Sequence, residues 1–341
     1  MDTFPVPARS LGRYYKVDGR NLERCYKEHL SGFSGWEQKE HASDWVLLPG
    51  NMGTKLSIDE SMHAKDLFTF LTNKDGHGGK GTLIAAVRGT KAEDVCRRLM
   101  RIPEEQRLAV EEVTMDFSDS MHAIATKCFP NARIVIDCFH IMQRVCEGMD
   151  EVRMECKRKA TTEQKKEEAE HKKKMARRRK ARDRYRKAHP RKRGEKRGRP
   201  RRRANERFKP ATLENGDTKV ELLTRGRYIL PKSGDDWSES QKKRARLIFT
   251  NYPKLRECHS LVCKLRAIFR DKKLTREQAR ERLHEWYKDV STANISEIAS
   301  AGDCIKSKEE EILNYFINRS TNAAAESFNS KTKTFRSEIR G

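Results

Sequence analysis

The spacing of hydrophobic and polar residues changes near Lys55, and this change separates an irregular region from a regular one. The first fifty residues predict short helices and loops, with the best helical stretch at 15–30. KLSIDES then predicts a short strand ending on Asp59 and Glu60, and DLFTFLT (66–72) alternates apolar and polar residues like a half-buried strand. The glycine-rich stretch KDGHGGKG predicts a turn, and TLIAAVR (82–88) a third strand. Together these segments predict an antiparallel meander.

Residues 91–137 predict two further strands, each preceded by a helix. KAEDVCRRLMRIPEEQRL (91–108) has apolar residues at helical spacing, and VEEVTMD (110–116) predicts a fourth strand. A short helix opens at Ser118 and stops before Pro130, and ARIVID (132–137) predicts a fifth strand. The order β-β-β-α-β-α-β is that of a ribonuclease H-like mixed sheet, so we predict an α/β fold of this class.

The chain after Phe139 is predicted to be mainly helical and increasingly charged. A basic segment at 171–209 begins as a possible solvated helix, and its Pro- and Gly-containing second half predicts disorder. Helices resume near Leu222, and a last pair is predicted at 306–317 and 322–335. The predicted organisation is an N-terminal region (1–50), the first part of the α/β core (51–150), a basic helical insertion (151–305) and C-terminal core helices (306–341).

Charge is concentrated in the basic segment. The 341-residue chain has a net charge of +24, and residues 171–209 hold 22 Lys and Arg against three acids. Such a segment indicates a polyanionic partner, although a solvated linker explains it too. The nine cysteines form no CxxC pair, and Cys258, His259 and Cys263 fit no common zinc spacing. Without an apolar run of roughly 18–20 residues, we expect a cytoplasmic protein with no membrane partner.

Two strand acids are the first candidates for chemistry. In the predicted fold the middle of the first strand and the end of the fourth lie side by side, which brings Asp59 and Asp116 together. Paired carboxylates repel unless a cation lies between them, and Mg²⁺ prefers such oxygen ligands. Turn acids at strand ends explain the same residues, and Glu60 competes with Asp59 because neighbouring strand residues point to opposite faces.

Further candidates lie in STNAAAESFNSKTKTF and after the fifth strand. At helical spacing Asn322, Glu326, Asn329 and Lys333 share a face, which suits a third metal-binding acid flanked by DNA-contacting side chains. An ordinary amphipathic helix with a solvated Glu326 explains the same spacing. Asp137 and His140 are supporting candidates, and a structural role for them is equally open. We treat both as supporting site residues: His140 either as a donor to a phosphate or as a group that orients a carboxylate, and Asp137 either as a direct metal ligand or as a group behind the ligands.

Four blocks in order carry a family resemblance. VTMDFSDSMHAIATKCFPNARIVIDCFHIMQRVCEGMDEVR, with SIDES before it and NAAAESFNSK after it, resembles DDE-type insertion-sequence transposases of the branch related to Mutator-like elements. The resemblance spans roughly residues 55–335 and places the family's catalytic, metal-binding triad on Asp59, Asp116 and Glu326, and its D-x-F-H motif on Asp137 and His140. It implies two Mg²⁺ ions, replaceable by Mn²⁺, strand cleavage at transposon ends and joining of the 3′-hydroxyl to target DNA.

The resemblance also sets expectations about partners. It implies DNA as substrate, a homodimer or larger assembly on DNA, and a bacterial, nucleoid-associated protein. Relatives carry a longer N-terminal recognition module and continue beyond the last helix, so we expect a truncated C-terminus. End recognition is expected either from a separate polypeptide or from residues 1–50 together with the basic segment. Alternatives are a nuclease without strand transfer and a catalytically inactive DNA-binding protein. Within the basic segment an AT-hook-like core is predicted to bind DNA at Arg197, Gly198, Arg199, Pro200 and Arg201.

Overall fold

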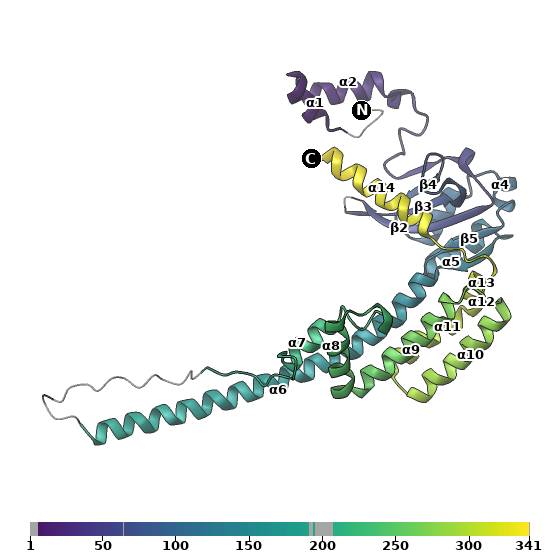
Figure 1. Cartoon of the computed structure of the whole chain (residues 1–341). Coiled ribbons are helices and arrows are strands. Elements are labelled where there is room, and N and C mark those ends of the chain that lie inside the picture. Colours follow the sequence, from purple (N-terminus) through teal and green to yellow (C-terminus); the bar gives the residue numbers. More distant parts are fainter. Residues whose placement is uncertain (1–5, 64, 191–193, 195–206, 341) are drawn as a thin grey trace. The chain divides into compact units, whose positions relative to one another are not determined.

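The computed structural model describes residues 6–63, 65–190, 194 and 207–340, which form two compact units. The first unit comprises residues 1–143, 271–283 and 304–341, and the second 144–270 and 284–303. The first unit is a mixed α/β structure around a six-stranded sheet, and the second is helical (Figure 1). None of the helices in the described ranges is long and apolar enough to cross a membrane.

The sheet of the first unit is mixed, with strand order β1-β4-β3-β2-β5-β6. Pairing is antiparallel from β1 to β2 across β4 and β3, and parallel from β2 through β5 to β6. The strands are β1 (Trp45–Leu47), β2 (Lys55–His63), β3 (Asp66–Asn73), β4 (Leu83–Arg88), β5 (Glu112–Met115) and β6 (Arg133–Ile136). The predicted element order from the first to the fifth strand is confirmed by β2 to β6.

Two strand predictions were wrong in detail. β1 lies in the region predicted to hold only helices and loops, where its three residues pair with the edge of β4. β2 does not end at Glu60 but continues to His63, because residues 60–63 pair with β3 as far as Asp66. Asp59 therefore lies in the middle of a nine-residue strand rather than at its end.

Helices cover both faces of this sheet. α5 packs on β2, β5 and β6, α3 packs against α5, and α14 lies on β2 (Figure 1). The helices assigned wholly to the first unit are α1 (Ala8–Tyr15), α2 (Gly19–Cys25), α3 (Ala92–Leu99), α4 (Glu104–Leu108), α5 (Asp119–Cys128), α12 (Glu309–Leu313), α13 (Tyr315–Asn318) and α14 (Ala323–Arg340).

Three predicted helices are interrupted. The stretch 15–30 breaks where Lys16 adopts a left-handed conformation that ends α1, and Asp18 then caps α2. The predicted helix 91–108 is divided into α3 and α4 before Pro103, which precedes the first residue of α4. The predicted helix 306–317 is divided between the end of α11 and the short helices α12 and α13.

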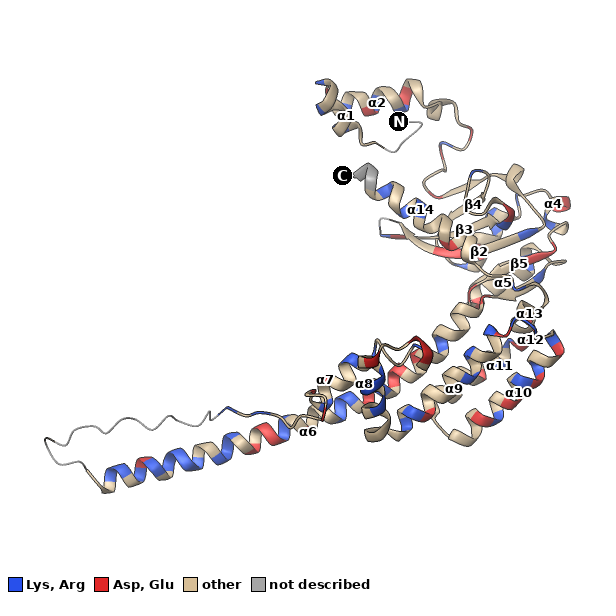
Figure 2. Cartoon of the chain, in the orientation of Figure 1, with Lys and Arg blue, Asp and Glu red and all other residues tan. Residues whose placement is uncertain are grey.

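The second unit is built from α7 (Lys219–Gly226), α8 (Glu239–Asn251) and α9 (Pro253–Arg270), with parts of α6 (Cys138–Ala188), α10 (Arg276–Ala293) and α11 (Ser296–Ser307). α6 is a single helix of 51 residues. Its last buried residue is Ala160, and the remainder is exposed or half-buried and strongly basic towards its end (Figure 2). The predicted solvated helix is confirmed up to Ala188, and the predicted disordered half lies almost entirely outside the described residues.

Candidate active site

Strand register brings three aspartates to one edge of the sheet. Ile58 of β2 pairs with Met115 of β5, and Met115 pairs with Ile136 of β6. The residue that directly follows each of these three in the sequence is an aspartate, namely Asp59, Asp116 and Asp137. Parallel strands lie about 4.8 Å apart, and residues in register point to the same face. The side chains of these acids therefore converge on the face covered by α14.

Asp116 is oriented by two side chains. Its Oδ1 atom accepts hydrogen bonds from Nε2 of His140 at 2.9 Å and from the side-chain amide of Asn322 at 2.9 Å. The hydrogen bond that His140 donates to Asp116 raises the pKa of His140 despite its partial burial, so the imidazole is favoured in its charged form. The other oxygen, Oδ2, accepts no hydrogen bond from any residue in the described ranges, which leaves it open to a ligand.

Asp59 lies beside Asp116 in a buried setting, with 9% of its surface exposed. Its Oδ1 atom accepts from the backbone N–H of Glu60 at 2.7 Å, and Oδ2 accepts from the side-chain amide of Asn329. Burial, followed by the charge of Asp116, raises the pKa of Asp59 to about 6 against the effect of these hydrogen bonds. The surroundings of Asp59 thus disfavour its charged form, and a cation bound beside it would stabilise that form.

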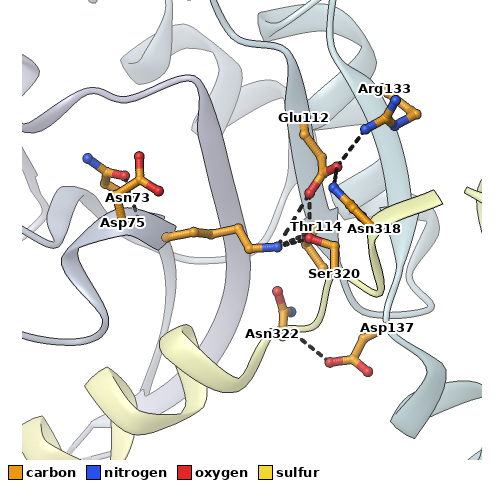
Figure 3. A network of polar contacts seen from close by, with 10 residues as sticks. Asn73, Asp75, Glu112, Thr114, Arg133, Asp137, Asn318, Ser320 and Asn322 are labelled. Atoms are coloured by element: carbon orange, nitrogen blue, oxygen red, sulfur yellow. Dashed lines mark hydrogen bonds and ion pairs between the residues drawn. The ribbon is translucent and has the colours of Figure 1, made fainter. Parts of the chain in front are cut away.

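Asp137 uses both of its oxygens within the protein. Oδ1 accepts from the backbone N–H of Phe139 at 2.9 Å, in the first turn of α6, and Oδ2 accepts from the backbone N–H of Asn322 at 2.7 Å (Figure 3). Only 3% of Asp137 is exposed. Asp137 therefore fixes the segment before α14 to the start of α6. Through this segment it helps to position the neighbouring acids.

The predicted polar face of α14 is divided in the structure. Asn322 is fully buried and Asn329 is 6% exposed, and both hold aspartates, although they were predicted to contact DNA. The side chain of Glu326 is exposed and forms no hydrogen bond or ion pair with the part of the chain that is described. Ala325 faces the sheet, and Glu326 is turned about 100° from it around the helix axis. The structure brings Asp59 and Asp116 together, but it does not bring Glu326 to them.

The donor atoms suit a hard cation in type. Besides the two carboxylates, the side-chain oxygens of Asn322 and Asn329 are buried and accept no hydrogen bond within the described ranges. Mg²⁺ prefers oxygen donors, often takes only one or two carboxylates from the protein and keeps several waters. Asp59 and Asp116 fit that requirement. Within the described part of the chain, however, no three His, Cys, Asp or Glu side chains are grouped to hold a metal.

The cysteine and histidine cluster of α9 has a structural environment. Nε2 of His259 lies 3.0 Å from the carbonyl oxygen of Lys232, and the Cys263 thiol contacts the same imidazole. Burial raises the pKa of Cys258 to about 12, which keeps this thiol protonated.

A family model described as transposase, of the DDE type in the ISL3 group, matches residues 56–341. The chain belongs to this transposase family. The match includes every candidate acid, all of the second unit and the part of the first unit from residue 56 onwards, and it connects the protein to DNA transposition with DNA as its substrate class. No match was found among curated proteins or solved structures.

The transposase also contains a buried network that sequence analysis missed. Glu112 of β5 is fully buried and accepts hydrogen bonds from Arg133 at 2.9 Å, from Asn318 at 2.6 Å and from Ser320 (Figure 3). Lys74 completes the network, with its Nζ atom 2.7 Å from the Thr114 hydroxyl and in contact with Ser320. The network ties the segment before α14 to the sheet, two residues ahead of Asn322.

Burial alone would raise the pKa of Glu112, but the hydrogen bonds from Ser320, Arg133 and Asn318 outweigh it and lower the pKa to about 2. Glu112 is thus held ionised in the interior of the transposase. No short sequence motif predicts this network, because its donors come from three separate parts of the sequence. The predicted AT-hook residues 197–201 lie outside the described residues, while Lys333 is exposed on α14.

Proposed function

We propose that this transposase cleaves DNA strands at transposon ends and joins the resulting 3′-hydroxyl to target DNA within a ribonuclease H-like core. The observation that supports this most is the convergence of Asp59 and Asp116 in a buried site where the pKa of Asp59 is raised to about 6. A carboxylate whose pKa is raised by burial and by a neighbouring like charge is characteristic of functional sites. The proposed cofactor is Mg²⁺, as two ions, with Mn²⁺ able to substitute.

The residues of the chain have separate tasks in this proposal. Asp59 and Asp116 would hold the cations, which supply activation of the attacking oxygen and neutralisation of the leaving oxygen in phosphodiester chemistry. His140 and Asn322 orient Asp116 through the same oxygen, leaving its other oxygen towards the substrate. Asn329 positions Asp59 through Oδ2, while Oδ1 accepts from the backbone N–H of Glu60. Glu326 is assigned as the third acid from the family resemblance alone.

In this proposal the chain also binds DNA at a surface away from the acid cluster. The exposed end of α6, residues 171–188, carries eleven Lys and Arg against one acid and offers a continuous surface for phosphates (Figure 2). We further propose that the transposase acts as a homodimer or larger assembly on DNA, together with a separate polypeptide for end recognition. Minor-groove binding by residues 197–201 stays a prediction.

The decisive experiment is cleavage of a supercoiled plasmid with Mg²⁺ or Mn²⁺, comparing the wild type with Asp116→Asn after equal DNA binding is shown. Metal-dependent nicking by the wild type alone supports the acid site, and transfer of a labelled 3′-hydroxyl end into a target plasmid then supports strand joining. Nicking without joining indicates a nuclease. Equal binding with no cleavage by either protein contradicts the proposed chemistry.

One observation favours a second candidate, a DNA-binding protein without catalysis. The side chain of Glu326 is exposed, and the described residues supply no third acid to Asp59 and Asp116. Such a protein binds DNA equally with Mg²⁺ or a chelator, and Asp116→Asn leaves its affinity unchanged. The same plasmid experiment separates the two candidates.

A further inference from the structure

The row of polar side chains on one face of β2 continues beyond Asp59. Ser61 and His63 follow at alternate positions, so they point to the same face as Asp59 and lie opposite Phe68 and Asp66 of β3. His63 is 9% exposed, and its ring packs edge-on against Phe70 with centroids 5.3 Å apart. Nε2 of His63 and the hydroxyl of Ser61 are buried and have no hydrogen-bond partner among the described residues. Buried polar atoms without partners are costly, which points to a missing ligand.

Two cationic side chains of α14, Lys333 and Arg336, lie four and seven residues after Asn329 and therefore on the same face of the helix. α14 lies along β2, since Asn329 of the helix contacts Asp59 of the strand. Further along the helix, the charges of Lys333 and Arg336 affect His63. Burial, followed by the charges of Lys333 and Arg336, lowers the pKa of His63 and favours its neutral form. Basic residues extend along the C-terminal part of α14 in Figure 2.

The expected counter-charge is absent from the described part of the chain. Asp66 lies opposite His63 in the sheet, but its carboxylate is 2.9 Å from Arg88 and pairs with that residue. Lys333 and Arg336 form no ion pair with any acid in the described ranges. Two unpaired cations beside a buried imidazole with an unused ring nitrogen form a site for an anion with several oxygens, and phosphate is the anion that DNA presents.

We infer that His63, Lys333 and Arg336 bind a backbone phosphate of the DNA strand that passes through the active site. This inference rests on the proposed function, because it takes the strand at Asp59 and Asp116 to be DNA. His63 lies four residues from Asp59, or about 13 Å along the strand, which corresponds to a few nucleotides at about 3.4 Å each along a duplex. The site therefore fixes the direction of the strand beside the acids.

The test measures DNA binding by the full chain in the presence of a chelator, so that cleavage plays no part. A fluorescent duplex is titrated at several KCl concentrations with the wild type and with Lys333→Ala/Arg336→Ala. Lys91→Ala/Lys127→Ala is the matched control, because both lysines are exposed in the same unit and form no ion pair in the described ranges. We expect the double variant to bind more weakly and its log–log salt slope to fall by about 0.9 for each phosphate that the protein no longer neutralises. The control is expected to match the wild type.

A second readout follows His63 directly and distinguishes DNA from free phosphate. In ¹⁵N-histidine-labelled protein, the ring resonances of His63 are expected to shift on addition of DNA, but not when inorganic phosphate replaces chloride at constant ionic strength. A His63 shift with inorganic phosphate but none with DNA overturns the inference. So does equal DNA binding by the double variant and the control. Because binding is measured without metal, a wild type that passes this test but never cleaves contradicts only the proposed chemistry.

Discussion

The side-chain amide of Asn322 donates a 2.9 Å hydrogen bond to Asp116, although 206 residues separate the two in the sequence. The backbone N–H of Asn322 donates to Asp137 at 2.7 Å, so one residue holds acids from two neighbouring strands. The orientation of Asp116 therefore depends on where the segment before α14 docks. This dependence leads to the first prediction.

Replacing Asn322 with Ala removes the amide that donates to Asp116 and leaves a space in the buried site. We expect the free energy of unfolding to fall by about 1–3 kcal/mol, and metal-dependent cleavage to fall by about 10–100-fold. Urea unfolding and plasmid nicking measure the two effects. Ser330→Ala, an exposed position on the same helix, is the control and should change neither. Wild-type cleavage by Asn322→Ala would show that Asp116 needs no such support.

Asp59 and Glu60 are adjacent but point to opposite faces of β2, so exchanging each carboxylate for its amide separates their roles. Asp59 faces Asn329 of α14, whereas Glu60 lies 3.5 Å from the Ser120 hydroxyl of α5. Loss of about 3 kcal/mol of transition-state stabilisation lowers a rate by about 100-fold, and we expect at least this for Asp59→Asn. Glu60→Gln should retain cleavage within a few-fold. The reverse result would assign the metal-binding position to Glu60.

Glu112 should make stability depend on pH in the acid range. Its folded pKa of about 2 lies below the ordinary value of 4.5, so ionised Glu112 contributes stability that is fully present above pH 4.5 and lost as pH falls towards 2. The shift corresponds to at most about 3 kcal/mol. We expect Glu112→Gln to be less stable than the wild type at pH 7, with a difference that shrinks below pH 4.5.

Urea unfolding at pH 7, 4 and 3 measures this difference. Glu111→Gln is the matched control, because Glu111 is the exposed neighbour of Glu112. It should follow the wild type at every pH. A constant difference between Glu112→Gln and the wild type across this range would mean that Glu112 is not held ionised by its partners.

The exposed basic end of α6 is predicted to bind duplex DNA without sequence preference. Arg177 and Arg178 lie on this surface, and replacing both with Gln should reduce the log–log salt slope of binding by about 0.9 for each phosphate that these arginines neutralise in the wild type. Lys272→Gln/Lys273→Gln removes the same charge from an exposed loop and serves as the control. If the affinity of both double variants falls equally, net charge rather than the helix end determines binding.

The strands that carry the acids were predictable because their signals are local. β3, β4 and β6 have apolar or alternating residues bounded by turns, and their order indicated the sheet. β1 was missed because three residues are too few to show a period, and its pairing with β4 is non-local. The end of β2 was missed because Ser61 and His63 are polar, and their burial depends on non-local packing that includes pairing with β3.

The site itself was only partly predictable. Asp59 and Asp116 follow from strand order, since neighbouring parallel strands bring their ends together. The roles of Asn322 and Asn329 could not be predicted in this way. Helical spacing shows which residues share a face, but it does not show which of them contact the sheet. Packing of Phe328 against Phe70, with ring centroids 5.7 Å apart, decides that orientation and turns Glu326 outwards.

The docking of α14 has a genetic consequence. All six strands are encoded before codon 137, whereas the amides that hold Asp59 and Asp116 are encoded at codons 329 and 322. A stop codon or frameshift shortly before codon 322 would preserve the coding sequence of the whole sheet and of the second unit, yet remove both amides. Lesions at this point should therefore abolish transposition as completely as early ones, while still producing a protein that contains the sheet and the basic segment.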